Sequence, residues 1–276
     1  IFITQLVGRE RLVEANSKQA SATSIAGLLG PVLAGMLVGW LGAPMAVTLD
    51  ALAFLVAAML VGSIRFREAA LTVSKSPGLV DMGEGLRFVW RHPLLRAFAL
   101  MAAMFIFLVD GFMALYVLYA TRGLHLTASQ LAVVNAIGAL GALAGATSVH
   151  RLNRQLGKHA VIVFGLALTA LGFIAYSQVP QGAWAVILAG AAMFLVEAGA
   201  TAYTVNYLAM RQMVTPDAML GRMTTTMRFL SVSAAPLGSA LSGYCADRFG
   251  ISLVLACLGF GGLAAALLSR WMIRRV

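Results

Sequence analysis

Apolar stretches of about 20 residues, separated by short polar segments, recur along most of this chain. A helix of about 20 residues crosses the ~30 Å hydrocarbon core of a bilayer. Eight such spans are predicted, near Ala20–Trp40, Pro44–Ile64, Leu94–Tyr119, Thr127–Val149, Ala160–Tyr176, Ala183–Leu208, Met223–Cys245 and Ile251–Arg270. The pattern predicts an all-α polytopic membrane protein.

Basic residues alternate regularly when the chain is threaded through these spans. With the first residue inside the cell, the inner loops and ends hold 18 of the 20 Lys and Arg residues, and only Arg122 and Arg248 fall outside. Cytoplasmic loops carry such an excess of positive charge. The alternation therefore predicts eight crossings, with both ends of this chain in the cytoplasm.

A repeat relates the two ends of the chain. Gly30-Pro31 and the exit Trp40-Leu41-Gly42 have counterparts in Ala235-Pro236 and Arg248-Phe249-Gly250, about 205 residues later. The first two spans thus correspond to the last two, and spans three to eight form a complete unit of six helices. Transporters are commonly built from such repeats around a central site. We expect a twelve-helix parent architecture, with helices 1–4 upstream of this chain.

Three parts follow from this arrangement. Residues 1–64 are expected to hold the last two helices of an N-terminal six-helix bundle. Residues 65–93 form a cytoplasmic linker with an amphipathic segment at Met82–Trp90, and residues 94–276 form the C-terminal six-helix bundle.

Composition excludes several function classes. Hydrophobic residues make up 61% of the chain and charged residues 11%, against about 25% charged in soluble domains. The net charge of +10 lies mostly between the spans, where it sets topology, so no nucleic-acid partner is expected. The two cysteines and four histidines form no metal, redox or hydrolytic pattern. We expect neither an enzyme nor a bound cofactor or metal.

Sequence patches point to a family. They are Leu6-Val7-Gly8-Arg9-Glu10-Arg11-Leu12, Asp50-Ala51-Leu52-Ala53-Phe54, Glu84-Gly85-Leu86-Arg87-Phe88 with His92-Pro93-Leu94, and Val214-Thr215-Pro216-Asp217. In this order they resemble the major facilitator superfamily, in the bacterial branch that includes enterobactin and macrolide exporters. The resemblance implies that the eight spans are helices five to twelve.

The first span carries a second likeness. Gly27, Gly30, Pro31 and Gly35 resemble the antiporter motif in helix five of the superfamily's exporters, although Ala34 stands where glycine is usual. Proline kinks a helix, and small residues let a neighbouring helix approach closely. An ordinary tight helix contact is the alternative interpretation.

Two acidic residues lie deep within predicted spans. Asp110 is 14 residues from Arg96 and 12 from Arg122, and Glu197 is 14 residues from Arg211. At about 1.5 Å per residue, both lie near the middle of the membrane, where an ionisable group is a candidate functional residue. We expect them to exchange protons or bind substrate, the alternative being a carboxyl group hydrogen-bonded to a neighbouring helix.

Four other polar residues are weaker candidates for a central cavity: Arg228, Asn135, Tyr203 and Asn206. Arg228 is more simply explained as a side chain that reaches the inner interface. Asn135, Tyr203 and Asn206 could equally form hydrogen bonds between helices.

Together these features predict a secondary active transporter of the bacterial inner membrane. The function expected is proton-coupled efflux of small amphipathic molecules, siderophore-like or drug-like, by alternating access. Its partners are then the small-molecule substrate, protons and the lipid bilayer. An importer of the same fold, and a partner-dependent membrane fragment that does not transport, remain alternatives.

Overall fold

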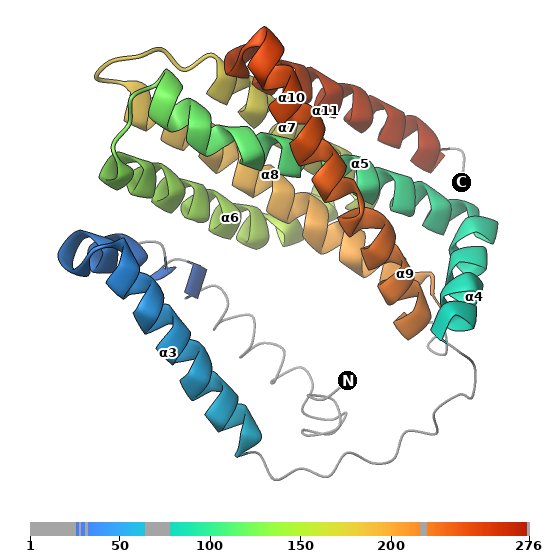
Figure 1. Ribbon diagram of the computed structural model, residues 1–276. Helices are drawn as coiled ribbons and strands as arrows, with labels where there is room; N and C mark the ends of the chain where they lie inside the picture. The colour runs from blue at the N-terminus through green and yellow to red at the C-terminus, as the bar shows by residue number, and fades with distance from the viewer. Residues whose placement is uncertain (1–25, 28, 31–32, 64–77, 216–219, 275–276) are drawn as a thin grey trace. The chain divides into compact units, whose positions relative to one another are not determined.

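The computed structural model of the protein describes residues 26–27, 29–30, 33–63, 78–215 and 220–274. The chain divides into two compact units, Ile1–Lys75 and Ser76–Val276. The described elements are all helical, as the apolar pattern predicts. Figure 1 shows them as a bundle of long helices in the second unit and a separate long helix, α3, in the first.

In the first unit, a helix over residues 33–41 leads through Gly42 into α3 (Ala43–Gly62). Gly42 has a φ of 79°, in the left-handed region that glycine adopts without steric cost. No residue of α3 is buried. Phe54, for example, is 71% exposed, so α3 presents apolar side chains on all sides, as suits a helix surrounded by lipid or by other membrane helices.

The second unit begins with α4 (Gly78–Arg91) and α5 (Pro93–Leu118). One π-helical turn, η2 (Tyr119–Gly123), precedes α6 (Ala128–Leu156) and α7 (Lys158–Ser177). The chain continues as α8 (Ala185–Met213), α9 (Leu220–Val232), α10 (Ala234–Phe249) and α11 (Ile251–Arg274). Among the described residues, six helices are long and apolar enough to cross a membrane: α3, α5 with η2, α6, α7, α8 and α11.

The seventh predicted span, Met223–Cys245, is two helices rather than one. Helix α9 ends at Val232 and α10 begins at Ala234, with Ser233 in a turn between them. Pro236 has no N–H to donate to the Val232 carbonyl, so the helical ladder is interrupted at this point. Of the first predicted span, Ala20–Trp40, residues 26–27, 29–30 and 33–40 are described, and they are helical.

Helix α4 contains the segment Met82–Trp90, which the sequence predicts to be amphipathic. Val89 is fully buried and Trp90 is 50% exposed. The helix packs against α5 and α9 at one end of the bundle (Figure 1). Among the residues of α4 whose burial is described, Val89 is buried and Arg87 and Arg91 are exposed, as suits an amphipathic helix at an interface.

Helices α6 and α8 approach each other closely within the bundle. Gly141 of α6 lies against the backbone of Phe194, and an added Cβ at Gly145 would come within 2.5 Å of the Ala198 carbonyl oxygen. Small residues at such contacts let helix backbones approach one another, which is the usual basis of helix association in membranes.

At the other end of α5, hydrogen bonds tie several helices together. The Tyr119 hydroxyl donates to the Ser177 carbonyl at 3.1 Å, and the Ser252 hydroxyl donates to the same carbonyl at 2.8 Å. The end of α7 is thereby bonded both to the turn after α5 and to the first turn of α11.

Candidate functional site

Asp110 lies in the middle of α5 and is half-buried. Residues 3, 4 and 7 positions apart share one side of a helix, so Asp110 shares its side with Met113, which is half-buried, and Val117, which is 42% exposed. The Ser239 hydroxyl of α10 donates to the backbone carbonyl of Asp110 at 3.2 Å. This bond fixes the main chain and leaves the carboxyl group available.

Glu197 lies in α8 and is also half-buried. Its Cγ would be 3.5 Å from a Cβ added at Gly138 of α6, so the glutamate stem occupies space that the glycine leaves open. Thr201 and Thr204 follow on the same side of α8, the first half-buried and the second exposed. Exposure on this side of α8 therefore increases from Glu197 towards Thr204.

Contacts between helices fix how deep the two carboxyl groups lie. The Tyr116 hydroxyl of α5 donates to Asn135 Oδ1 of α6 at 2.9 Å. Gly138, beside Glu197, follows Asn135 by three residues, and Asp110 precedes Tyr116 by six. Because α5 and α6 run in opposite directions (Figure 1) and this bond joins them, Glu197 and Asp110 lie about 4.5 Å and about 9 Å from the bond in the same direction along the bundle.

A second contact brackets the pair from the opposite side. The rings of Phe105 in α5 and Tyr203 in α8 are 4.2 Å apart. Asp110 lies five residues from Phe105, and Glu197 lies six residues from Tyr203. These separations correspond to about 7.5 Å and about 9 Å along the two axes. Both contacts thus place the two carboxyl groups within about 5 Å of the same depth.

Neither carboxyl group makes a hydrogen bond or an ion pair with any residue that the structure describes. An unpaired carboxylate within a membrane costs about 2.5–3.5 kcal/mol on insertion scales. A bound cation or a proton would neutralise such a carboxylate and offset this cost, which helix packing alone does not do. Within the described part of the chain, no group of three His, Cys, Asp or Glu residues could hold a metal ion.

The weaker candidates separate into two kinds. Asn135 is half-buried and bonded to Tyr116, close to the depth of Glu197. Tyr203 and Asn206 are each only 2% exposed. Tyr203 stacks on Tyr207, with ring centroids 5.5 Å apart.

Asn206 forms a bond between helices instead of lining open space. Its Oδ1 accepts a 2.8 Å hydrogen bond from Asn153 of α6, and its amide donates to the Ala202 carbonyl at 3.1 Å. The buried placement of Asn206 and Tyr203 differs from the cavity position expected from the sequence. Asn206 thus joins α8 to α6 by a hydrogen bond, which is the alternative that the sequence left open, whereas the Tyr203 hydroxyl is buried with no hydrogen-bond partner among the described residues.

Arg228 is exposed on α9, four residues before the end of that helix. Of the antiporter-like motif, Pro31 lies outside the described residues. Gly27, Gly30 and Gly35 are helical, and no described residue comes within 4 Å of a Cβ added at any of them. The described residues therefore show no close helix contact at this motif.

The structure adds two residues that the sequence interpretation missed. Gly138 makes room for the Glu197 stem, and Ser239 anchors the Asp110 backbone. A signal for the first exists in the sequence, because Gly138, Gly141 and Gly145 are spaced to share one side of α6. Ser239 has no comparable signal, since its partner is 129 residues away along the chain.

Comparison with known proteins gives the family. The Major Facilitator Superfamily model matches residues 1–239. An uncharacterized MFS-type transporter, y4rN of Sinorhizobium fredii, is 26% identical over 270 residues, which cover 96% of this chain and 65% of that protein. The multidrug efflux pump Tap of Mycolicibacterium fortuitum is 27% identical, with 90% of this chain and 60% of that pump covered.

Solved structures show the same fold. A bacterial homologue of the iron transporter ferroportin, in an inward-facing state, matches with a TM-score of 0.71 at 16% identity, covering 99% of this chain and 65% of that one. The chain spans 60–65% of the length of these relatives. On the family match, with which the helical fold agrees, this chain belongs to the Major Facilitator Superfamily.

Proposed function

We propose that this protein exports small amphipathic molecules in exchange for protons, and that Asp110 and Glu197 are the groups that exchange them. The observation that carries the proposal is the pair of half-buried carboxyl groups at similar depth on α5 and α8, neither of them bonded to a described residue. The resemblance to a multidrug efflux pump supports export.

The chemistry of the site favours a large, partly apolar cation as substrate. Asp110 lies beside Met113, and Glu197 lies beside Met193 and Phe194. Methionine and aromatic side chains adapt to apolar ligands of varied shape and attract cations. A carboxylate among them supplies the opposite charge, and its protonation removes that attraction.

Exchange of a proton for the substrate then follows because the proton and the cationic substrate compete for the same carboxylates. When substrate is released on one side of the membrane, each carboxyl group takes up a proton from that side. After the site reopens to the other side, the proton leaves and the carboxylate binds the next cation. Alternating access between two bundles is the usual mechanism of such repeat-built transporters.

Transport into membrane vesicles tests this proposal. Everted vesicles containing the protein, with an acidic lumen, are predicted to accumulate the lipophilic cation tetraphenylphosphonium. Glu197→Gln and Asp110→Asn should each reduce this accumulation at least tenfold, because neither amide can exchange a proton or carry the negative charge. Accumulation by both variants at the wild-type rate would refute the assignment.

Matched controls separate charge from structure. Asp247→Asn removes an exposed carboxylate at the end of α10 and should leave transport unchanged. Glu197→Asp keeps the carboxyl group and should retain part of the activity that Glu197→Gln loses. Accumulation seen only in right-side-out vesicles would instead identify an importer.

A further inference from the structure

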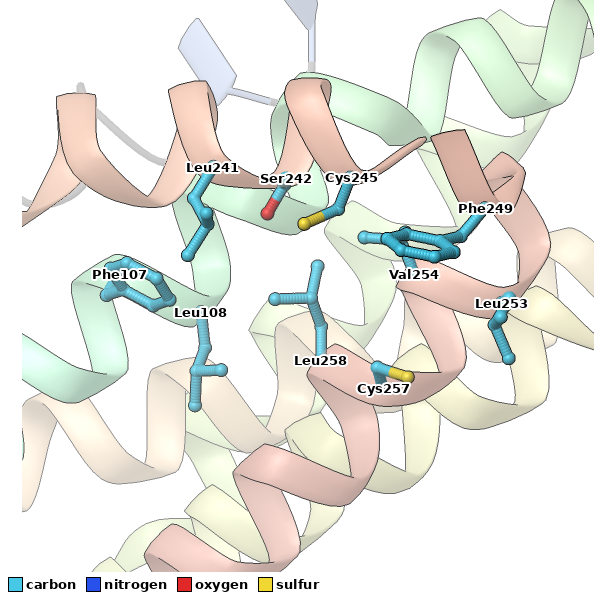
Figure 2. A pocket seen from close by; sticks show the side chains of 10 residues that line it. All are labelled: Phe107, Leu108, Leu241, Ser242, Cys245, Phe249, Leu253, Val254, Cys257 and Leu258. Carbon is cyan, nitrogen blue, oxygen red and sulfur yellow. The ribbon is translucent and has the colours of Figure 1, made fainter. Parts of the chain in front are cut away.

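A crevice of about 370 Å³ lies where α5, α10 and α11 meet, apart from the two carboxyl groups. Its volume is within the range of small-molecule sites, about 300–1,000 Å³. Figure 2 shows Cys245 between Ser242 and Phe249 on the α10 wall, with Leu258 and Cys257 on the α11 side. Asp110 and Glu197 do not line it, so the transport mechanism leaves this space unexplained.

The crevice is apolar and opens onto an apolar surface. Ser242 is its one hydroxyl-bearing residue and is 3% exposed, pressed against Gly111 of α5. On its rim, Leu241, Phe249 and Leu253 are 52%, 65% and 55% exposed. An opening edged by exposed leucine and phenylalanine favours a hydrocarbon ligand over a polar one.

The exposed surface of α10 shows which way the crevice opens. One exposed strip contains the small and polar residues Ala240, Gly243 and Asp247. A second strip contains Leu237, Leu241 and Tyr244, at positions that share one side of a helix. The crevice adjoins this second strip at Leu241, and the second strip is the one suited to face lipid.

A positive charge lies at the end of the same strip. Arg248 follows Tyr244 by four residues, and its guanidinium lies 4.8 Å above the Tyr244 ring. Arg248 is exposed in the last turn of α10 and makes no ion pair with a described residue. A guanidinium held at a helix end, beside an apolar crevice, complements a phosphate group attached to a hydrocarbon chain.

The depth of the crevice fits one leaflet. From Phe249 to Leu241 the α10 wall extends eight residues, which is about 12 Å of helix. This is a little less than half of the ~30 Å hydrocarbon core. We propose that the crevice binds an acyl chain of a bilayer phospholipid from the leaflet next to Arg248, with the phosphate of that lipid paired to Arg248.

Photocrosslinking tests the proposal directly. The purified full chain is reconstituted with a trace of phosphatidylglycerol that carries a diazirine in the middle of one acyl chain, and the adducts are mapped by mass spectrometry. We expect adducts on the crevice segment, residues 241–258, to exceed several-fold those on the exposed side chains of Trp184, Ile187 and Leu188, which do not line this crevice. A diazirine-labelled diacylglycerol, which lacks the phosphate, should label the crevice more weakly.

Substitutions then separate the crevice from general lipid contact. Cys245→Phe should fill the space and remove the excess of adducts, whereas Leu237→Phe, on the same strip but outside the crevice, should not. Cys257→Phe fills the crevice from the α11 wall, where Cys257 is exposed. It replaces Cys245→Phe as the filling variant if the gel-filtration profile shows that Cys245→Phe disturbs the fold. Arg248→Gln should remove the preference for phospholipid over diacylglycerol.

Two results would overturn the proposal. One is an adduct pattern unchanged by both filling variants, which would mean that lipid contacts the bundle without entering the crevice. The other is equal labelling by phospholipid and diacylglycerol in the wild-type protein, which would mean that Arg248 holds no phosphate.

Discussion

Three residues fix the surroundings of the two carboxyl groups at the residue scale. Ser239 holds the Asp110 backbone, Gly138 gives space to Glu197, and Tyr116 joins α5 to α6 through Asn135. None of these contacts engages a carboxyl oxygen. The packing therefore positions Asp110 and Glu197 without pairing their carboxyl oxygens to any described residue.

The Tyr116–Asn135 hydrogen bond is expected to stabilise the bundle measurably. Tyr116→Phe leaves the half-buried Asn135 oxygen without its donor, which should lower the free energy of unfolding by about 1 kcal/mol. Thermal unfolding of the purified protein, followed by helix circular dichroism, would show the difference as a lower midpoint.

Tyr244→Phe is the matched control, because Tyr244 is 58% exposed and phenylalanine still presents a ring to Arg248. It should leave the unfolding midpoint near that of the wild type. Equal midpoints for Tyr116→Phe and the wild type would show that this bond contributes nothing to stability.

The position of a residue along its helix can be predicted from sequence spacing, whereas its burial depends on neighbours from other helices. The depth of Asp110 and Glu197 follows from their distance to flanking arginines, since a helix rises by a fixed amount per residue. The burial of Tyr203 could not be predicted in the same way. Tyr207 lies four residues from it on the same helix, but Phe105 lies on α5, and a contact between helices is not recorded in local spacing.

At the scale of elements, the glycine side of α6 determines how closely that helix approaches α8. Gly141→Ala would push a methyl group into the backbone of Phe194. Because backbone cannot rotate away as a side chain can, we expect this change to cost about 1–3 kcal/mol of stability, visible as a lower unfolding midpoint in detergent.

Gly243→Ala supplies the comparison. Gly243 lies inside α10 with no described atom within 4 Å of an added Cβ, and alanine is the better helix former by about 1 kcal/mol. Its midpoint should equal or exceed that of the wild type. A Gly141→Ala protein as stable as Gly243→Ala would contradict the close approach of α6 and α8.

Most helices were predictable because the length of an apolar run in the sequence gives the approximate length of the membrane-spanning helix. The predicted spans near Leu94–Tyr119 and Ala160–Tyr176 agree closely with α5 and α7. The division of the span near Met223–Cys245 was missed, although Pro236 marks it in the sequence. Hydrophobicity identifies where a chain crosses a membrane, whereas the continuity of the helix depends on backbone donors.

At the scale of the whole molecule, family and fold agree with the repeat and the alternating charges. A superfamily match over residues 1–239 and a TM-score of 0.71 to a transporter homologue establish the fold. The membrane orientation, the division at residues 64 and 93, and the upstream helices remain predictions. The substrate and the coupling ion must be argued from the residues of the site, because proteins of one fold serve many functions.

The measurement that tests the central claim most directly is the release of protons when substrate binds. Purified protein in weakly buffered detergent solution, mixed with tetraphenylphosphonium, should release protons that a pH-sensitive dye detects. Glu197→Gln and Asp110→Asn should each release fewer, and Asp247→Asn should match the wild type. Binding without proton release, or an unchanged release from the Glu197→Gln and Asp110→Asn double variant, would contradict the claim that these two carboxyl groups exchange protons for substrate.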